Sequence, residues 1–152
     1  MSQFGDYEVD FYGWAVRNAQ LLRQGRFAEI DVEHIAEELE SMSKKDQREL
    51  ESRFIILIAH LLKWQYQLQQ IMAMWSWQGG SWRGSIIEQR VQIAKLLRNN
   101  PGLKPHLSEA IANAYPDAVE LASEETQLAK STFPDVCPYT VEQLLEKEFY
   151  PQ

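Results

Sequence analysis

The fold is decided by the stretch from Ser52 to Trp77, which reads SRFIILIAHLLKWQYQLQQIMAMWSW. From Phe54 to Leu62 every residue except His60 is apolar, so a helix formed here is apolar almost all round. Such a helix lies at the centre of a bundle, because each of its faces has to be covered by a neighbour. The stretch therefore predicts a central helix that holds His60 at least partly buried.

The sequence on both sides of this stretch also repeats its apolar residues at helical spacing. Gly25 is expected to end the first helix in a left-handed conformation, and Asp31 to cap the second. Near Ser43 the second helix either stops and restarts or runs through with a bend. Thr140 and Gln143 form a capping box for the last helix. The expected helices cover residues 8–24, 32–70, 86–99, 105–126 and 141–148.

No strand pattern and no internal repeat are visible in the sequence. The pattern is typical of the all-α class, in which helices bury their apolar faces against one another. We expect a single domain over residues 1–152, built as a helical bundle of five or six helices. Short connections make most neighbouring helices antiparallel.

Composition narrows the function classes. The chain has 152 residues, of which 45% are hydrophobic and 24% charged, as in ordinary globular proteins. A single cysteine, Cys137, fits a reducing compartment. The start of the chain carries no signal-peptide pattern, and no apolar run approaches the roughly 18 residues of a membrane span. We expect a soluble, cytoplasmic protein without a membrane partner.

Charge is distributed unevenly along the chain. Residues 1–51 carry 12 acidic and 6 basic side chains, whereas residues 82–106 carry 5 basic side chains and one acidic. The net charge of −7 argues against a nucleic-acid binder, because contacts to phosphates need a basic footprint. Complementary helices that dock on one another explain such segregation. Weak nucleic-acid association through the basic segment 83–104 is kept as a third hypothesis.

Acidic side chains gather at Glu37, Glu38 and Glu40, beside the apolar Ile35 and Leu39. Three interpretations stay open: a network of ion pairs, a solvated helix face and a functional carboxylate cluster. In the first interpretation, guanidinium groups are the natural partners, because they make bidentate bonds to carboxylates at partly buried places. The candidate arginines are Arg53, Arg83 and Arg90.

His60 allows a structural and a functional interpretation. A buried imidazole needs a hydrogen-bond partner, and the acidic helix offers carboxylates. The structural interpretation is a His–carboxylate contact that fixes the helix order, and the functional one is a general base or metal ligand. An enzyme is therefore the alternative function, and its candidate residues are Glu37, Glu38, His60 and Arg90, none of them assigned as catalytic.

Further motifs for chemistry are missing from the sequence. Cys137 has no basic neighbour that would lower its pKa, and no Ser–His elbow or glycine-rich phosphate loop is present. His34 and Glu37 have the spacing of a helical metal site, but a bundle site needs a second such pair. We expect no metal site and no cofactor.

A cluster of aromatic and methionine side chains follows the central helix. Methionine adapts to irregular surfaces and tryptophan is enriched at binding hot spots, so these side chains either extend the core or form an interaction patch. A homodimer is the simplest cover for such a patch, because two-fold pairing lets it bury itself. The interaction candidates are Met72, Met74, Trp75, Trp77 and Trp82.

A series of landmarks occurs along the chain: Tyr7–Trp14, Leu21–Arg23, Asp31, Glu37–Glu40, His60–Trp64, Ser81–Arg83, Arg90, Phe133–Pro134 and Cys137–Tyr139. In this order they resemble a bacterial family known as domain of unknown function number 29. The resemblance implies a small helical protein of bacterial origin and brings no established activity or catalytic residues. Relative to that family, residues 71–80 look like an aromatic insertion.

The favoured function is a non-enzymatic interaction or regulatory module that binds another protein or a second copy of itself. A helical surface with an aromatic patch and no assembled catalytic motif is typical of a binding module. The enzyme and the nucleic-acid hypotheses stay behind it.

Overall fold

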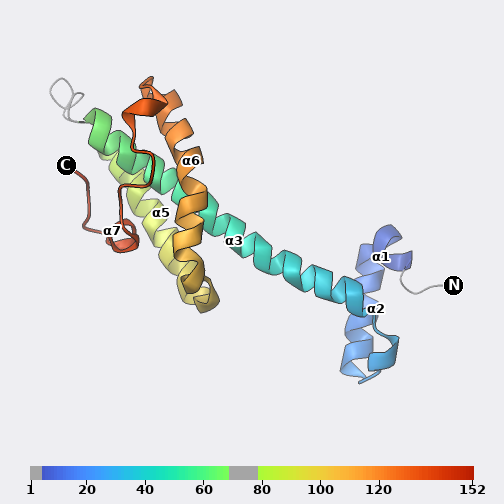
Figure 1. The fold of residues 1–152 in the computed structure, drawn as a ribbon. Helices are drawn as coiled ribbons and strands as arrows, with labels where there is room; N and C mark the ends of the chain where they lie inside the picture. The colour runs from blue at the N-terminus through green and yellow to red at the C-terminus, as the bar shows by residue number, and fades with distance from the viewer. Residues whose placement is uncertain (1–4, 69–78) are drawn as a thin grey trace. The chain divides into compact units, whose positions relative to one another are not determined.

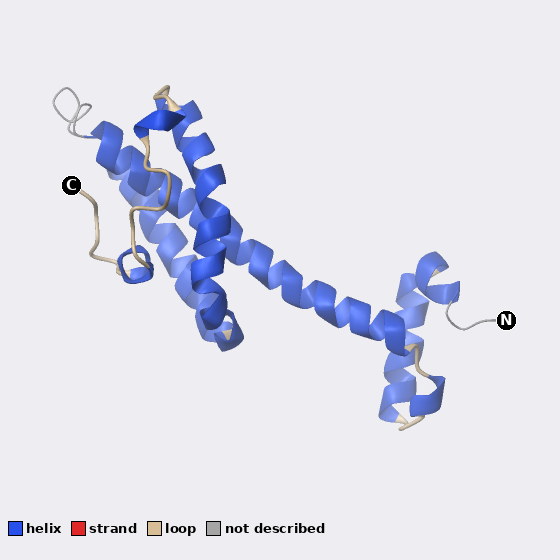
Figure 2. Cartoon of the chain, in the orientation of Figure 1, coloured by secondary structure: helices blue, strands red, loops and turns tan. Residues whose placement is uncertain are grey.

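The computed structural model describes residues 5–68 and 79–152, and all regular secondary structure within these residues is helical (Figure 1). Figure 2 shows helices joined by short loops and turns. The expected all-α class is confirmed. None of the helices described for these residues is long and apolar enough to cross a membrane. The α-helices are α1 (Gly5–Val9), α2 (Phe11–Arg23), α3 (Val32–Lys63), α5 (Gly79–Asn99), α6 (Leu107–Thr126) and α7 (Val141–Leu145).

The chain forms two compact units, Met1–Lys45 and Asp46–Gln152. Helix α3 runs through the division, so its first turns belong to the first unit and its remaining turns to the second. Short 3₁₀ helices at Phe27–Glu29, Pro101–His106 and Lys130–Thr132 connect the α-helices within each unit.

The first expected helix is in fact two, because Asp10 interrupts it. The Asp10 carboxylate accepts a hydrogen bond from the backbone N–H of Gly13 at 2.9 Å and so caps α2. A Cβ atom at position 13 would lie 2.3 Å from Asp10 Oδ2, which explains the glycine. At the other end of α2, Gly25 has a φ of +73°, as expected for a left-handed helix end.

The second expected helix is continuous past Ser43. The Ser43 hydroxyl donates to the Glu40 carbonyl oxygen at 2.8 Å, so its polar group is satisfied inside the helix. Of the two alternatives at this point, the uninterrupted helix is therefore confirmed. The α-helix ends earlier than predicted, at Lys63, where a π-helical turn over Trp64–Leu68 follows.

Helix α5 also begins earlier than expected. The pair Gly79–Gly80 opens the helix, although the sequence placed a chain break there and a cap at Ser81 or Ser85. Glycine is unfavourable inside helices, but it costs only about 1 kcal/mol per residue and tertiary packing overrides it. The capping box at Thr140 is confirmed. The Thr140 hydroxyl oxygen accepts from the Gln143 N–H, and the Gln143 side-chain oxygen accepts from the Thr140 N–H.

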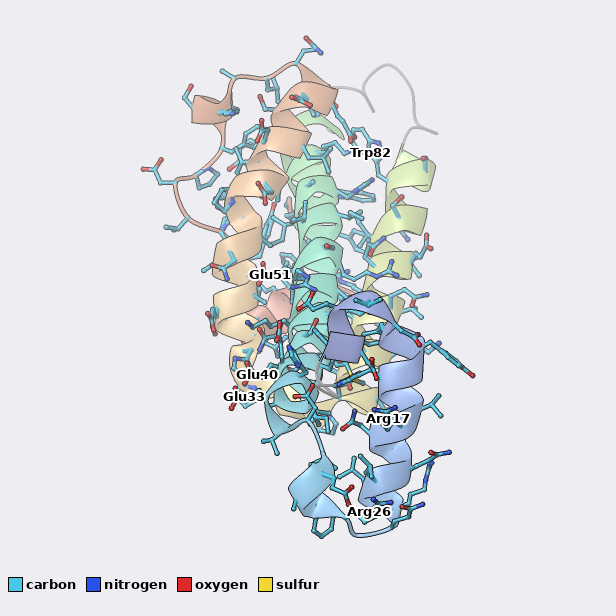
Figure 3. All side chains as sticks on the ribbon, turned by 90° about the vertical axis from the view of Figure 1, so that its right-hand side faces the viewer. Arg17, Arg26, Glu33, Glu40, Glu51 and Trp82 are labelled. Carbon is cyan, nitrogen blue, oxygen red and sulfur yellow. The ribbon has the colours of Figure 1, made fainter. Side chains whose placement is uncertain are left out.

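The core of the second unit lies between α3, α5 and α6, which run side by side in Figures 1 and 3. Alanines four residues apart form the inner edge of α6 and let the helices approach closely. As the stretch Phe54–Leu62 predicts, its side chains form the centre of this core. The fully buried side chains include Leu50, Phe54, Leu57, Ile58, Leu61 and Leu62 of α3, Ile86 and Ile93 of α5, Ala118 and Ala122 of α6, and Leu144 of α7.

The first unit has a much smaller apolar interior. Among its described residues only Trp14 and Leu21 are buried apolar side chains. Nine large apolar side chains of the same unit are between 41% and 89% exposed. The unit is held together mainly by hydrogen bonds and aromatic contacts around Trp14. The exposed residues are Val9, Phe11, Tyr12, Val16, Leu22, Phe27, Val32, Leu39 and Met42.

Candidate functional site

A buried carboxylate organises the first unit. Asp31 stands immediately before α3 and is 4% exposed. Its Oδ2 accepts hydrogen bonds from Trp14 Nε1 at 2.9 Å and from His34 Nδ1 at 2.7 Å, and its backbone N–H donates to Asn18 Oδ1 at 2.8 Å. Burial acts to raise the pKa of Asp31, but the hydrogen bonds from His34 and Trp14 outweigh it and lower the pKa. Asp31 therefore stays ionised and joins α2 to α3.

His34 and Tyr7 stack on one another beside this carboxylate. Their ring centroids lie 3.9 Å apart at an interplanar angle of 18°, and the Tyr7 hydroxyl donates to Glu38 Oε1 at 2.5 Å. That hydrogen bond raises the pKa of Tyr7 to about 12. The hydrogen bond to Asp31 raises the pKa of His34. These contacts attach α1 to α3.

The candidate catalytic residues divide between the two units. Glu37 and Glu38 lie in the first unit, where Glu38 accepts the Tyr7 hydroxyl and Glu37 is exposed. His60 and Arg90 lie in the second unit, each with its own partners. Within the second unit, His60 bonds to its own helix and Arg90 to the C-terminal segment.

His60 has a backbone partner instead of the carboxylate that the sequence suggested. Its Nδ1 lies 2.8 Å from the carbonyl oxygen of Ile56, one turn earlier in α3. A carbonyl oxygen only accepts, so Nδ1 carries a proton. Burial lowers the pKa of His60, which disfavours its charged form. The side chain is half-buried in the second unit.

Arg90 clamps the C-terminal segment to α5. It is 5% exposed, and its guanidinium donates to the carbonyl oxygens of Leu144 at 2.9 Å, Gln143 at 3.1 Å and Phe149 at 2.9 Å. Burial lowers the pKa of Arg90. The ring of Tyr150 lies 5.6 Å from its guanidinium carbon. Its N–H groups therefore donate to backbone carbonyl oxygens that would otherwise be unpaired at and after the end of α7.

The other two arginines suggested as partners of the acidic cluster have different contacts in the second unit. Arg53 Nη2 lies 3.8 Å from Glu49 Oε1 on the same helix, and Arg53 Nη1 donates to Gln89 Oε1 of α5 at 3.3 Å. Arg83 stacks over aromatic rings, as described below. The contacts found for Arg53 and Arg83 are thus with residues of the second unit.

Lys63 is a buried cation that the sequence analysis did not single out. It is 4% exposed and pairs with Glu125 of α6. Its ammonium nitrogen also lies 5.3 Å from the centroid of the Trp82 ring. The only signal in the sequence is its place at the end of the apolar run, where a charge would be expensive to bury without a partner. The ion pair links α3 to α6, and the contact with Trp82 links α3 to α5.

The aromatic interaction candidates are divided by the limits of the described residues. Met72, Met74, Trp75 and Trp77 lie outside them. Trp82 lies within the described residues, near the start of α5, and is labelled in Figure 3. Its half-buried ring lies beside the Lys63 ammonium group of the second unit.

A groove of about 630 Å³ lies between α5 and the C-terminal segment. We call it the α5 groove. Its apolar floor on α5 is formed by Ile87, Val91 and Ala94, of which Ile87 is 49% and Val91 58% exposed. The other lining residues are Arg83, Arg90, Leu145, Glu146, Lys147, Glu148 and Tyr150.

Arg83 closes one end of the α5 groove. Its guanidinium carbon lies 4.8 Å from the ring centroid of Tyr150 and 5.6 Å from that of Trp64. Cation–π contacts of this kind hold the planar group in place while leaving its donors at the surface. The groove thus combines an apolar floor with a positioned cation.

A second apolar surface lies on the first half of α3. Val32, Leu39 and Met42 are seven and three residues apart, which places them on one side of a helix of 3.6 residues per turn. They are 59%, 62% and 64% exposed. Glu33 and Glu40, both exposed and labelled in Figure 3, border this surface. We call the three apolar residues the α3 stripe.

Metal chemistry finds no support in the part of the chain that the structure describes. Across residues 5–68 and 79–152, no three His, Cys, Asp or Glu side chains are grouped so that they could hold a metal ion. Cys137 is half-buried, and burial raises the pKa of its thiol, which disfavours the reactive thiolate.

The helical bundle defines the class of this protein: a small all-α protein. The chain belongs to the family described as Domain of unknown function DUF29, whose family model matches residues 7–150. The resemblance found in the sequence motifs is thereby confirmed over nearly the whole chain. Comparisons with curated proteins and with solved structures gave no match.

Proposed function

We propose that this chain is a non-enzymatic protein-interaction module and that its first unit associates with a second copy of the chain. The observation that carries the proposal is the exposure of nine large apolar side chains on a unit with only two buried ones among its described residues. Large exposed apolar surface on a folded protein often marks a site of interaction with another protein. An associating surface explains why so many large apolar side chains lie outside the core.

The charge distribution supports a second copy as the partner. The first 51 residues carry a net charge of −6, and residues 82–106 a net charge of +4, so each copy offers both members of a complementary pair. Opposite charges steer two such surfaces together and fix their register. Two-fold symmetry then forms the same contact twice, so the dimer buries twice the area of one contact.

The contacts of the candidate catalytic residues also support a non-enzymatic function. Glu38 accepts a tyrosine hydroxyl, His60 is bonded to a backbone carbonyl and Arg90 holds three carbonyl oxygens of the C-terminal segment. Each of these contacts has a structural purpose in its own unit. An enzyme needs its acid, base and positioning groups around one substrate.

Light scattering on the purified chain at micromolar concentration tests the proposal. We expect twice the chain mass of 17.7 kDa for the wild type. The double variant Leu39→Ser/Met42→Ser should shift to the monomer mass and keep its helical circular dichroism, because both side chains are exposed. A matched control is Val136→Ser, which removes an exposed apolar side chain from the second unit.

Two results would contradict this proposal. The first is a wild-type chain that stays monomeric at every concentration measured. The second is a dimer that Leu39→Ser/Met42→Ser leaves intact. The variant Met74→Ser/Trp75→Ser tests the aromatic segment that the sequence suggested. If only that variant dissociates the dimer, the interface lies in the aromatic segment and the role proposed for the first unit is wrong.

A further inference from the structure

The α5 groove and the α3 stripe have matching chemistry. The groove has an apolar floor on α5. Its charged lining on α5 is Arg83 and Arg90, and its C-terminal wall carries Glu146, Lys147 and Glu148. The α3 stripe is apolar and is bordered by Glu33 and Glu40. One surface thus presents apolar side chains among cations, and the other presents apolar side chains among acids.

We propose that the α5 groove is a receptor site for an acidic amphipathic helix, and that its occupant is the first half of α3 from a second copy of the chain. This inference rests on the proposed function and deepens it by naming the two surfaces that meet. Helix-in-groove recognition uses apolar anchors spaced three, four and seven residues apart. Leu39 and Met42 are three residues apart, and Val32 and Leu39 are seven apart.

The dimensions of the two surfaces agree. At about 1.5 Å per residue, Val32 and Met42 stand roughly 15 Å apart along α3. On α5, Arg83 and Ala94, the first and last groove residues of that helix, stand roughly 16 Å apart by the same rise per residue. Three turns of helix therefore fit along the groove. Its C-terminal wall also carries Glu146 and Glu148, so the acidic border of the occupant should face α5 and not this wall.

Charge also decides between this contact and a pairing of two first units. Two copies of the segment 1–51 would each bring a net charge of −6, and like charges oppose such an interface. The contact between the first unit of one copy and α5 of the other joins opposite charges. Each copy supplies one stripe and one groove, so two copies of the chain hold both members of this contact.

Disulfide crosslinking between two full-length variants tests which surfaces meet. Both variants carry Cys137→Ser, so that each has one introduced cysteine: Leu39→Cys in one, Val91→Cys in the other. After mixing and mild oxidation with copper–phenanthroline, we expect a crosslinked heterodimer, because apposed Cβ atoms within about 4.5 Å form disulfides. The matched control replaces Val91→Cys with Val136→Cys, another exposed valine, and should give no product above background.

The other outcomes separate this inference from the proposed function. A dimer in light scattering without the Leu39→Cys/Val91→Cys product overturns the groove as receptor and leaves the proposed function standing. Crosslinking between two copies of the Leu39→Cys variant points to paired first units and also overturns the groove as receptor. A single chain that carries both cysteines and crosslinks at the monomer mass shows that the occupant is not a second copy. A wild-type monomer overturns both proposals.

Charge variants supply an independent measurement. Glu33→Arg/Glu40→Arg should raise the dissociation constant of the dimer at least about tenfold, because it turns attraction to α5 into repulsion. The matched control is Glu142→Arg, on the exposed side of α7. If instead the variant leaves the dimer intact, and Arg98→Glu abolishes binding of a single-stranded oligonucleotide, then the basic surface of α5 serves nucleic acid and the inference is wrong.

Discussion

The indole nitrogen of Trp14 donates a hydrogen bond to Asp31 Oδ2 at 2.9 Å, inside a unit that has almost no other buried side chains. This contact joins α2 to the start of α3 across 17 residues of sequence. The same carboxylate oxygen lies 2.7 Å from His34 Nδ1. One buried acid therefore holds together the unit that we propose to be the associating surface.

Asp31→Asn should weaken the first unit. The amide keeps the shape of the carboxylate but loses the charge that strengthens the bonds from Trp14 and His34. Hydrogen bonds to charged groups contribute about 1.5–3 kcal/mol, and we expect a loss in this range. Hydrogen exchange at the amides of α2 measures it. Glu33→Gln, two residues further along the chain and exposed, is the control and should change little. Equal exchange in both variants would contradict the role of Asp31.

The pKa values of the two histidines of α3 should be displaced in opposite directions from the ordinary histidine pKa. His34 has its pKa raised by the hydrogen bond to Asp31, and His60 has its pKa lowered by burial. The His34–Asp31 pair therefore stabilises the folded unit below the ordinary histidine pKa, and this contribution is lost as the pH rises through the pKa of folded His34. NMR titration of the imidazole resonances measures both values.

The variant Asp31→Asn provides the control for this titration. It should lower the pKa of His34 and leave that of His60 unchanged, because His60 contacts Ile56 and not Asp31. A pKa of His34 below that of His60 in the wild type would contradict the contacts described here.

Leucines at the centre of the second unit should be the most costly to remove. Leu57 and Leu61 are fully buried, and replacing either with Ala leaves a cavity. We expect each variant to lose about 2–5 kcal/mol of unfolding free energy. Urea denaturation followed by circular dichroism measures the loss, with Val136→Ala as an exposed control. Losses below about 1 kcal/mol at both leucines would be incompatible with a buried central helix.

Arg90→Met should release the C-terminal segment. The apolar side chain keeps much of the length of arginine, but the carbonyl oxygens of Gln143, Leu144 and Phe149 lose their donors. The unfolding free energy should fall by about 1.5–3 kcal/mol, as for bonds to a charged group. Proteolysis should then cut residues 146–152 faster than in the control Arg98→Met, which alters an exposed arginine. Equal rates in the two variants would show that Arg90 is not the clamp.

Local patterns in the sequence determined most of the helices. The apolar run from Phe54 to Leu62 placed the buried centre of α3, since an all-round apolar helix has to be covered. Gly25 and the Thr140 capping box marked helix ends correctly, because both act through backbone geometry of neighbouring residues. The break at Asp10 was missed although its cause, the side-chain cap on the N–H of Gly13, is local. The helical start at Gly79 was missed because helix propensity is a weak guide.

Only the tertiary structure decided the partners of the polar side chains. The sequence offered carboxylates to His60 and to three arginines, but the structure pairs His60 with a carbonyl, Arg90 with the C-terminal backbone and Lys63 with Glu125. Helical spacing says which side of a helix a residue occupies, and says nothing about what lies across from it. By itself, the sequence determined the all-α class, the central helix and the family. The partners of buried charges, the α5 groove and the uncovered α3 stripe depend on contacts between residues far apart in the chain, which only folding brings together.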